Sequence, residues 1–457
     1  MKMEYSEGDE LIESGVDWIG QVPSHWDTVK VRFVARLESG HTPSRSVDEY
    51  WENCDIPWVT TSDIKKFRGG QKLYLENTVN EISELGLENS GARLLPKGTV
   101  FLSRTASVGF AGIMGQDMAT SQDFANWVCG DDVLPEYLVY VFRSMDQEFS
   151  RLMQGSTHQT IYMPDIRSLE MPLPPVPEQE RIVSYLKEHL STIDSILNDK
   201  MGLVERLDQK RHAEITTAIT EGIRPDAKTV NTNNDWFSEV PEHWDIMRLK
   251  RLRKRHIPIV YGIVQPGPDQ DEGIPYIKGG QCEPEKLDPE LLSKTTPEIA
   301  EKYERSRLNE GELVYEIRGS VGRVVEVPPE LDGANLTQDT ARISPREGIN
   351  TKWLLYALRS QPFFQQMEVN RRGATVEGVN LFDLRRGLLP VPPEDEQVEI
   401  ASYLSEVDEN ISKVKRAVEQ SIDLLKEEQQ SLTKAVVTGD INVEKVQSSD
   451  KPRNNLA

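Results

Sequence analysis

The chain has 457 residues, a formal net charge of −22 and three cysteines. Its hydrophobic content of 37% and charged content of 28% are typical of a soluble protein with more than one domain. The acidic N-terminal residues lack the apolar core of a signal peptide, and no apolar stretch approaches the roughly 18 residues of a membrane span. We therefore expect a cytoplasmic protein without membrane contact. Three scattered cysteines are too few for a disulfide framework or a zinc site, so we expect no metal centre.

A short acidic tail, residues 1–14, precedes a motif that occurs twice. This opening motif spans residues 15–34. Six of its residues recur 218 positions later, which pairs Trp18 with Trp236, Val22 with Val240, Pro23 with Pro241, His25 with His243, Trp26 with Trp244 and Asp27 with Asp245. Indole side chains bury a large apolar area, so we interpret the motif as an anchor for the first strand. A histidine without an acidic or cysteine partner favours a structural role over a catalytic one.

Short β-like runs separated by turn residues fill the stretch from the opening motif to residue 171. The main runs are residues 56–64, 98–114 and a helical 135–149, and the second half repeats them at 274–280, 311–327 and 351–367. The repeated runs are joined by residues that differ between the halves. This pattern indicates one fold that reads two different ligands.

Basic residues concentrate in these divergent stretches. A basic run occupies residues 248–255, and the residues that we select as candidate DNA contacts are Lys65, Lys66, Arg68, Lys278, Arg371 and Arg372. A basic surface is the usual electrostatic footprint of a nucleic-acid binder. The divergent stretches, rather than the acidic remainder, are therefore where we expect DNA to bind.

Polar turns supply further candidates. A glycine-led loop at residues 155–167 matches a second loop at 373–385. Hydroxyl, amide and guanidinium groups in such loops and in glycine-bounded turns can donate to phosphates or base edges. The candidates are Arg104, Ser107, Thr157, Gln159, Arg318, Ser320 and Thr375. The arginines at 104 and 318 are equally compatible with structural ion pairs, and we expect Asp165 and Asp383 to be turn or cap residues.

Two long helical segments, residues 174–222 and 392–439, repeat at the same shift. Each begins after two prolines with carboxylates in the first turn, carries apolar residues three or four positions apart, and ends at a glycine. A helix of about forty residues is roughly 60 Å long. Its apolar face needs a partner along the whole length, so we expect the two helices to pair. Residues 178–221 contain nine acidic and six basic residues, and residues 394–440 contain twelve acidic and five basic residues. The two helical segments therefore carry −10 of the chain's net charge of −22. Acidic helices favour contact with protein over contact with phosphate.

The opening SGVDWIGQVPSHW, the turn GELVYEIRGSVG, the Gly-Ser/Ala-Thr loops and the helix start PPxxEQxxIxxYL occur in an ordered, duplicated arrangement. In this arrangement the chain resembles the specificity subunit of type I restriction-modification systems over nearly its whole length. The resemblance implies an α+β fold with two homologous α/β target-recognition domains. Two long helices, packed as an antiparallel coiled coil, would separate and join these domains in a pseudo-twofold repeat.

The resemblance also implies domain bounds and partners. The target-recognition domains would be residues 15–172 and 229–388, the spacer helices 173–228 and 389–440, and the tails 1–14 and 441–457. Each domain would read half of a split double-stranded DNA site, while the spacers dock two adenine-methyltransferase subunits and restriction (helicase-nuclease) subunits join the complex. S-adenosylmethionine, ATP and Mg are implied for the partners, and no cofactor for this chain. The expected partner contacts are Ile182, Leu186, Ile193, Leu404, Val407 and Ile411.

Motifs of enzymes that act on DNA are missing from the sequence. It contains no ATPase phosphate loop, no Asn/Asp-Pro-Pro-Tyr/Phe tetrapeptide of amino-methyltransferases and no nuclease constellation after its Pro-Asp pairs. We therefore expect a non-catalytic subunit without catalytic residues. The alternative is a duplicated coiled-coil scaffold for protein interactions without intrinsic DNA specificity, which the acidic charge favours and the basic clusters disfavour.

Overall fold

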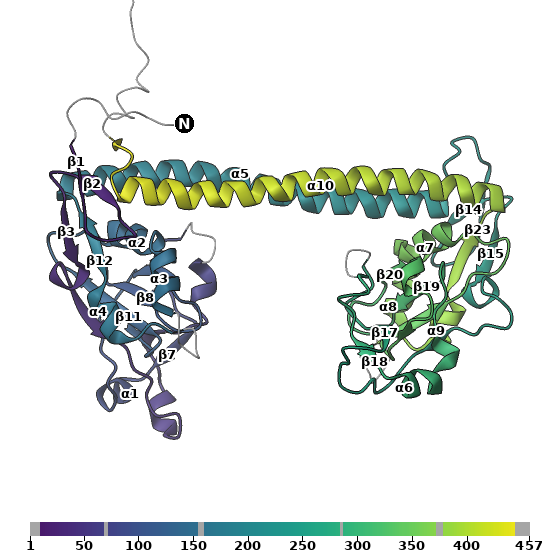
Figure 1. Cartoon of the computed structure of the whole chain (residues 1–457), viewed down its shortest axis with the longest axis horizontal. Helices are drawn as coiled ribbons and strands as arrows, with labels where there is room; N and C mark the ends of the chain where they lie inside the picture. Colours follow the sequence, from purple (N-terminus) through teal and green to yellow (C-terminus); the bar gives the residue numbers. More distant parts are fainter. Residues whose placement is uncertain (1–9, 68–71, 154–159, 284–286, 372–377, 444–457) are drawn as a thin grey trace, which may run out of the picture. The chain divides into compact units, whose positions relative to one another are not determined.

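The computed structural model describes residues 10–67, 72–153, 160–283, 287–371 and 378–443 (Figure 1). The chain divides into two compact units, the first made of residues 1–201 and 420–457 and the second of residues 202–419. Each unit holds one of the divergent regions together with parts of both long helices.

A five-stranded sheet with the order β4-β11-β8-β9-β6 forms the centre of the first unit. Its strands are β4 (Ala35–Ser39), β11 (Phe124–Cys129), β8 (Val100–Ser103), β9 (Ala111–Met114) and β6 (Tyr74–Leu75). A three-stranded sheet is formed by β10 (Ala119–Thr120), β5 (Ile56–Val59) and β7 (Asn80–Ile82), in the order β10-β5-β7. β5 pairs in parallel with β10 and antiparallel with β7.

The central sheet separates two cores. Along β8, Val100 and Leu102 belong to the core shared with helix α2 (Pro135–Arg143), whereas Phe101 belongs to a second core with Phe124. Successive side chains of a strand point to opposite faces, and here both faces are covered. This is why all of β8 is buried and why its sequence is a continuous apolar run instead of an alternating one.

Smaller elements complete the first unit. The strand pairs are β1 (Leu11–Glu13) with β2 (Gln21–Pro23) and β3 (Asp27–Lys30) with β12 (Glu170–Leu173), and the helices are α1 (Glu84–Glu88), α3 (Asp146–Met153), α4 (Met163–Ser168), η1 (Val31–Phe33), η2 (Asp48–Trp51) and η3 (Ile64–Phe67). The predicted helical run 135–149 is therefore two helices. The Ser144 hydroxyl donates to the Tyr140 carbonyl at 2.9 Å and closes α2 before α3 begins.

The second unit repeats this topology, as the duplicated sequence predicts, except that its main sheet has no described counterpart of β6. Its main sheet has the order β16-β22-β19-β20, formed by β16 (Val260–Tyr261), β22 (Thr340–Ile343), β19 (Leu313–Glu316) and β20 (Val324–Glu326). The smaller sheet has the order β18-β17-β21, formed by β18 (Lys294–Thr295), β17 (Ile274–Ile277) and β21 (Asn335–Leu336). β17 pairs in parallel with β21 and antiparallel with β18, which repeats the pairing of β5.

The remaining elements of the second unit also match the first, except for two of its 3-10 helices. The elements are β13 (Thr229–Asn231) with β14 (Glu239–Pro241), β15 (Asp245–Arg248) with β23 (Leu388–Val391), α6 (Pro297–Lys302), α7 (Thr351–Arg359), α8 (Gln361–Arg371), α9 (Leu381–Arg386), η4 (Leu249–Arg251), η6 (Glu304–Ser306) and η7 (Pro329–Leu331). The two exceptions are η6 and η7, which occupy other places in the element order than η2 and η3. The predicted run 351–367 is again two helices. Pro362 has no N–H to continue α7, so α8 starts anew at Gln361.

A buried ion pair crosses the main sheet of the second unit. The guanidinium of Arg342 on β22 donates to both carboxylate oxygens of Glu312, at 2.6 and 2.7 Å, and both side chains are buried. Burial raises the pKa of Glu312, but the bonds from Arg342 and from the backbone N–H of Asn309 outweigh it, so the pKa is lowered overall. Such a pair is strongly destabilising to break, because the remaining charge stays buried.

Both long helices form as predicted. Helix α5 spans Val176–Thr220 and helix α10 spans Glu394–Val437, which are 45 and 44 residues. In the second unit they run in opposite directions, since Asp208 binds Lys415 at 2.8 Å and, one turn on, Arg211 binds Ser412 at 2.7 Å. The partners move backward along α10 as the residues move forward along α5. The helix pair is therefore antiparallel.

The opening motif fixes the start of each long helix. In the first unit the Nε2 atom of His25 lies 3.0 Å from Oε2 of Glu178, and in the second unit Nε2 of His243 lies 2.8 Å from Oε2 of Glu396. The expectation that these histidines lack an acidic partner is therefore wrong. The indole N–H of Trp244 also donates to Glu396, at 3.2 Å. The acids belong to the helix starts, so the contacts join the motif to the helices.

The glutamine after each of these acids ties the same region together. The buried amide of Gln179 donates to the carbonyls of Asp132 and Pro174, each at 2.8 Å, and accepts the N–H of Leu134 at 2.9 Å. Gln397 makes the corresponding three bonds before α7 and α10. The Glu-Gln pair of the repeated helix start is therefore structural in both units.

A glycine in the left-handed region follows each long helix. Gly222 and Gly439 both have a φ angle of +81°, a backbone conformation that residues other than glycine rarely adopt. A Cβ on Gly222 would lie 3.2 Å from the Trp244 ring, and one on Gly439 would lie 2.4 Å from Pro23 and 3.2 Å from Trp26. Each helix therefore ends against an opening motif, α5 in the second unit and α10 in the first.

Candidate nucleic-acid interface

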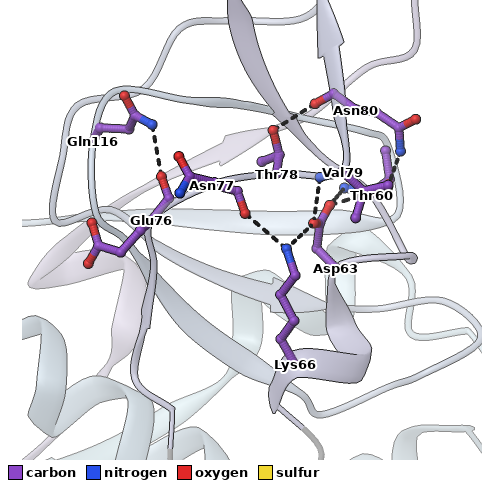
Figure 2. A network of polar contacts seen from close by, with 9 residues as sticks. All are labelled: Thr60, Asp63, Lys66, Glu76, Asn77, Thr78, Val79, Asn80 and Gln116. Atoms are coloured by element: carbon purple, nitrogen blue, oxygen red, sulfur yellow. Dashed lines mark hydrogen bonds and ion pairs between the residues drawn. The ribbon is translucent and has the colours of Figure 1, made fainter.

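Two of the candidate lysines lie on η3 of the first unit. Lys65 and Lys66 are both exposed, but Nζ of Lys66 donates to Oδ1 of Asp63 at 3.2 Å and to the carbonyl of Asn77 at 3.0 Å (Figure 2). Asp63 is fully buried and also accepts the backbone N–H of Val79 at 2.9 Å. A buried carboxylate requires such partners. Lys66 therefore neutralises Asp63, whereas Lys65 presents its charge to solvent.

Arg104 and Ser107 lie in the turn between β8 and β9. The Arg104 guanidinium donates to the carbonyls of Gln122, at 3.0 Å, and Ile161, at 3.3 Å. It thus joins the turn to the segment before β11 and to the segment before α4. Ser107 is half-buried in the same turn. The contacts of Arg104 are structural, and they hold the turn at one end of the main sheet.

The corresponding turn of the second unit carries Arg318 and Ser320. The N–H groups of Gly280 and Ser320 both donate to Oε1 of the buried Glu316, at 2.8 and 3.0 Å. Arg318 Nη1 lies 3.8 Å from Oδ1 of Asp339. This is the ion pair anticipated as an alternative for Arg318. An exposed pair of this kind contributes less than about 1 kcal/mol, so the guanidinium stays available to a ligand.

Lys278 belongs to the same cluster. It lies two positions from Gly280, whose N–H binds Glu316, and its Nζ is 3.4 Å from the hydroxyl oxygen of Ser293. The structure thus brings Lys278, Arg318 and Ser320 to one end of the second unit's main sheet. The remaining candidates Arg68, Thr157, Gln159, Arg372 and Thr375 lie outside the described residues, and Arg371 is the last residue of α8, with no described side chain.

The candidate partner-contact residues lie along the helix pair. Ile182 and Leu186 are buried in the core of the first unit, with Ile193 packed against it. Leu404 is buried in the core of the second unit, Ile411 is also buried and Val407 is half-buried. Ile182, Leu186 and Leu404 pack with α5, α10 and the sheet of their own unit. Their side chains stabilise the helix pair and do not form an exposed surface.

The two aspartates expected in turns or caps lie in the first turns of short helices. Asp165 is in α4 and Asp383 is in α9. The N–H of Asp383 is capped by the side chain of Asn380 at 2.9 Å. Both therefore serve helix starts, where the dipole favours a negative charge.

Comparison of the sequence with known families decides among these interpretations. A family profile described as the type I restriction modification DNA specificity domain matches residues 23–203 and 267–423. The chain belongs to this family. Each matched stretch runs from a divergent region into a long helix, so the two matches reproduce the duplication seen in the fold.

Individual members of the family match over almost their whole length. The chain is 24% identical to the MjaIX type I restriction enzyme specificity subunit of Methanocaldococcus jannaschii, over 94% of this chain and 96% of that protein. It is 23% identical to the EcoBI type I restriction enzyme specificity subunit of Escherichia coli, over 96% of this chain and 91% of that protein. A chain solved in work on complex assembly and conformational transition of the type I system has a TM-score of 0.67 at 18% identity, covering 92% of this chain and 99% of that chain. This last likeness shows the shared fold.

Membership in the specificity family assigns the chain a recognition role and no catalytic one. Within the ranges that the structure describes, no helix has the length and apolar character to cross a membrane, and no group of three His, Cys, Asp or Glu side chains is arranged to hold a metal ion.

Sequence reasoning overlooked one feature of the specificity chain. Phe33 and Phe382 are large, exposed apolar side chains, and each has an arginine guanidinium over its ring, from Arg32 and Arg386 respectively. The 218-residue shift does not align the two phenylalanines, so a search for repeated residues passes over them. A search for exposed Phe-Arg neighbours would have found the first, whose residues are adjacent in sequence.

Proposed function

We propose that this specificity chain directs a type I restriction-modification complex to a split DNA site. Each of its two target-recognition domains, residues 15–172 and 229–388, reads one half of the site. The observation that carries the proposal is the repeated framework with divergent polar turns. Four strands of the main sheet, the three strands of the smaller sheet and the Glu-Gln contacts at the helix starts correspond between the units, while the groups at the sheet ends differ.

The difference at the sheet ends has the chemistry that base recognition requires. The turn after β8 offers hydroxyl groups beside an arginine held by carbonyls. The turn after β19 offers Arg318, Ser320 and Lys278 around a buried carboxylate. Major-groove base edges differ in their pattern of donors and acceptors, so two turns with different donors suit two different half-sites. The candidates in the glycine-led loops belong to the same proposal.

The proposal assigns the reactions to other subunits. The long helices, residues 173–228 and 389–440, dock two methyltransferase subunits that methylate adenine with S-adenosylmethionine. Restriction subunits that use ATP and Mg join the same complex, which works in the cytoplasm. The acidic character of the helices suits a protein partner. The scaffold alternative gains no support, because the family profile includes both divergent regions, which a scaffold does not need.

Selection from random DNA tests the proposal. The specificity chain, purified alone and together with its methyltransferase, is incubated with random duplexes, and bound DNA is separated by gel shift and sequenced. The complex is expected to enrich two short motifs at a fixed separation. The chain alone is expected to bind weakly, since a net charge of −22 limits the number of phosphate contacts. Enrichment of nothing, or of one continuous motif, would contradict the two-reader proposal.

A further inference from the structure

Each unit contains a junction between a 3-10 helix and a short α-helix. In the first unit η1 packs on α4, and in the second unit η4 packs on α9. The N–H of Val31 donates to the carbonyl of Leu169 at 2.9 Å, and the N–H of Leu249 donates to that of Gly387 at 2.8 Å. The positions correspond at the 218-residue shift, Val31 to Leu249 and Leu169 to Gly387. The two junctions are therefore the same piece of framework in two copies.

Both junctions expose a phenylalanine with an arginine above it. Phe33 is 70% exposed, and the guanidinium carbon of Arg32 lies 5.2 Å from the centre of its ring. Phe382 is 63% exposed, and the guanidinium carbon of Arg386 lies 4.9 Å from the centre of its ring. A cation over an aromatic ring at an exposed site contributes about 0.5–1 kcal/mol, too little to explain leaving a large apolar ring in water.

The two rings come from different elements of the same junction. Phe33 is on η1, and the matching residue of η4 is Arg251; Phe382 is on α9, and the matching residue of α4 is Pro164. Inheritance from a duplicated ancestor therefore does not account for the second ring. Each unit carries an exposed Phe-Arg pair of its own, in the same part of the framework.

The charge of the junctions indicates what they bind. The elements η1 and α4 contain two basic residues and one acidic residue. The elements η4 and α9 contain four basic residues and one acidic residue. Both are thus locally positive in a chain of net charge −22. A positive surface with an exposed ring fits the sugar-phosphate backbone of nucleic acid, where arginine binds phosphate and the ring packs on sugar or base.

We infer that these junctions are sequence-independent DNA contacts, one in each unit. The inference rests on the proposed function and adds a division of labour to it. The framework junctions hold the backbone of the duplex, while the divergent turns read its bases. Contacts to phosphate and sugar fix the position of a protein on DNA and carry no sequence information directly, so they can be shared by two domains of different specificity.

The test uses the full-length chain in complex with its methyltransferase. Two double variants, Arg32→Ala with Phe33→Ala and Arg386→Ala with Phe382→Ala, are compared with the wild type by fluorescence anisotropy. The probes are a duplex with the selected site and a scrambled duplex, each at several salt concentrations. Control variants remove an exposed apolar side chain elsewhere, Leu94→Ala in the first unit and Leu291→Ala in the second. Thermal melting confirms that every variant is folded.

Each double variant is expected to lose affinity about tenfold on both duplexes, with the salt slope lowered by about 0.9 for each lost phosphate contact. The controls should bind as the wild type does. Unchanged affinity in the folded double variants overturns the inference and leaves the proposed function standing. A loss of affinity for the selected duplex alone would show that the junctions read bases. A loss of methyltransferase co-elution would show that they are a protein-docking surface. Either result also overturns the inference. A wild-type complex that binds no DNA overturns the proposed function itself.

Discussion

Replacing Leu404 with alanine tests how the helix pair is held together. Leu404 lies on α10, is 1% exposed and belongs to the core of the second unit with Ile219 of α5 and Trp353 of α7. Leucine-to-alanine changes in a packed core remove apolar contacts and leave a cavity, at a cost of about 2–5 kcal/mol. We take about 3 kcal/mol as the expected loss for this position.

Leu424 provides the matched control on the same helix. It is 65% exposed, so the same change there is expected to cost less than about 0.5 kcal/mol. For a unit of this size, 1 kcal/mol shifts the melting temperature by about 2–4 °C. Leu404→Ala should therefore lower the melting temperature of the second unit by about 6–12 °C, and Leu424→Ala should change that of the first by no more than about 2 °C.

Hydrogen exchange measured by mass spectrometry on the full-length chain separates the two units. In Leu404→Ala, peptides from residues 202–419 should lose protection, while peptides from the divergent region of the first unit keep theirs. Co-purification with the methyltransferase, measured on the same samples, should fall as the pairing of α5 and α10 weakens. Equal melting temperatures for the two variants would refute the assignment of Leu404 to the helix-pair core.

Alanine at Gly439 should destabilise the first unit more than alanine at Gly222 destabilises the second. The left-handed backbone costs about 1–2 kcal/mol at both, and a Cβ at position 439 also lies 2.4 Å from a proline ring; equal losses in melting temperature would contradict this. Glu312→Gln leaves the buried Arg342 without its carboxylate, so we expect a loss of about 3–5 kcal/mol at pH 7. The folded pKa of Glu312 is lowered, so its stabilisation is present above the unfolded pKa of about 4.3 and is lost as the pH falls through the folded value. The urea midpoints of variant and wild type should therefore converge between pH 5 and strongly acidic pH, and a constant difference would count against the ion pair. Burial raises the pKa of Cys129 to about 12, so iodoacetamide at pH 8 should label it far more slowly in the native chain than in urea, and equal rates by mass spectrometry would show that the thiol is accessible.

The repeated features of the fold are the ones that the sequence predicts well. The long helices have strong periodicity, proline starts and glycine ends, so their bounds follow within a few residues. The duplication itself comes from the 218-residue shift. The breaks at Ser144 and Ser360 were not predicted, because an apolar periodicity that continues across a break does not show where one helix ends and another begins.

The candidate site is predicted less completely, because the partner of a polar side chain is distant in the sequence. Glu178 lies 153 residues from His25, and Gln122 lies 18 residues from Arg104. Spacing alone therefore does not show that these side chains have protein partners. For Lys66 the limit is different, because its partner Asp63 is only three residues away, but the sequence does not show that Asp63 is buried and therefore needs a cation.

Replacement of residues 15–172 by the corresponding region of another family member tests the central claim most directly. The opening motif and the helix start at Pro174 occur in both halves, so the exchange leaves the framework contacts in place. Methylated adenines are then mapped in the genome of a host that carries the variant and its methyltransferase. The two-reader account predicts that one half-site changes, while the other half-site stays as in the wild type. A change in both half-sites, or in neither while methylation persists, would contradict it.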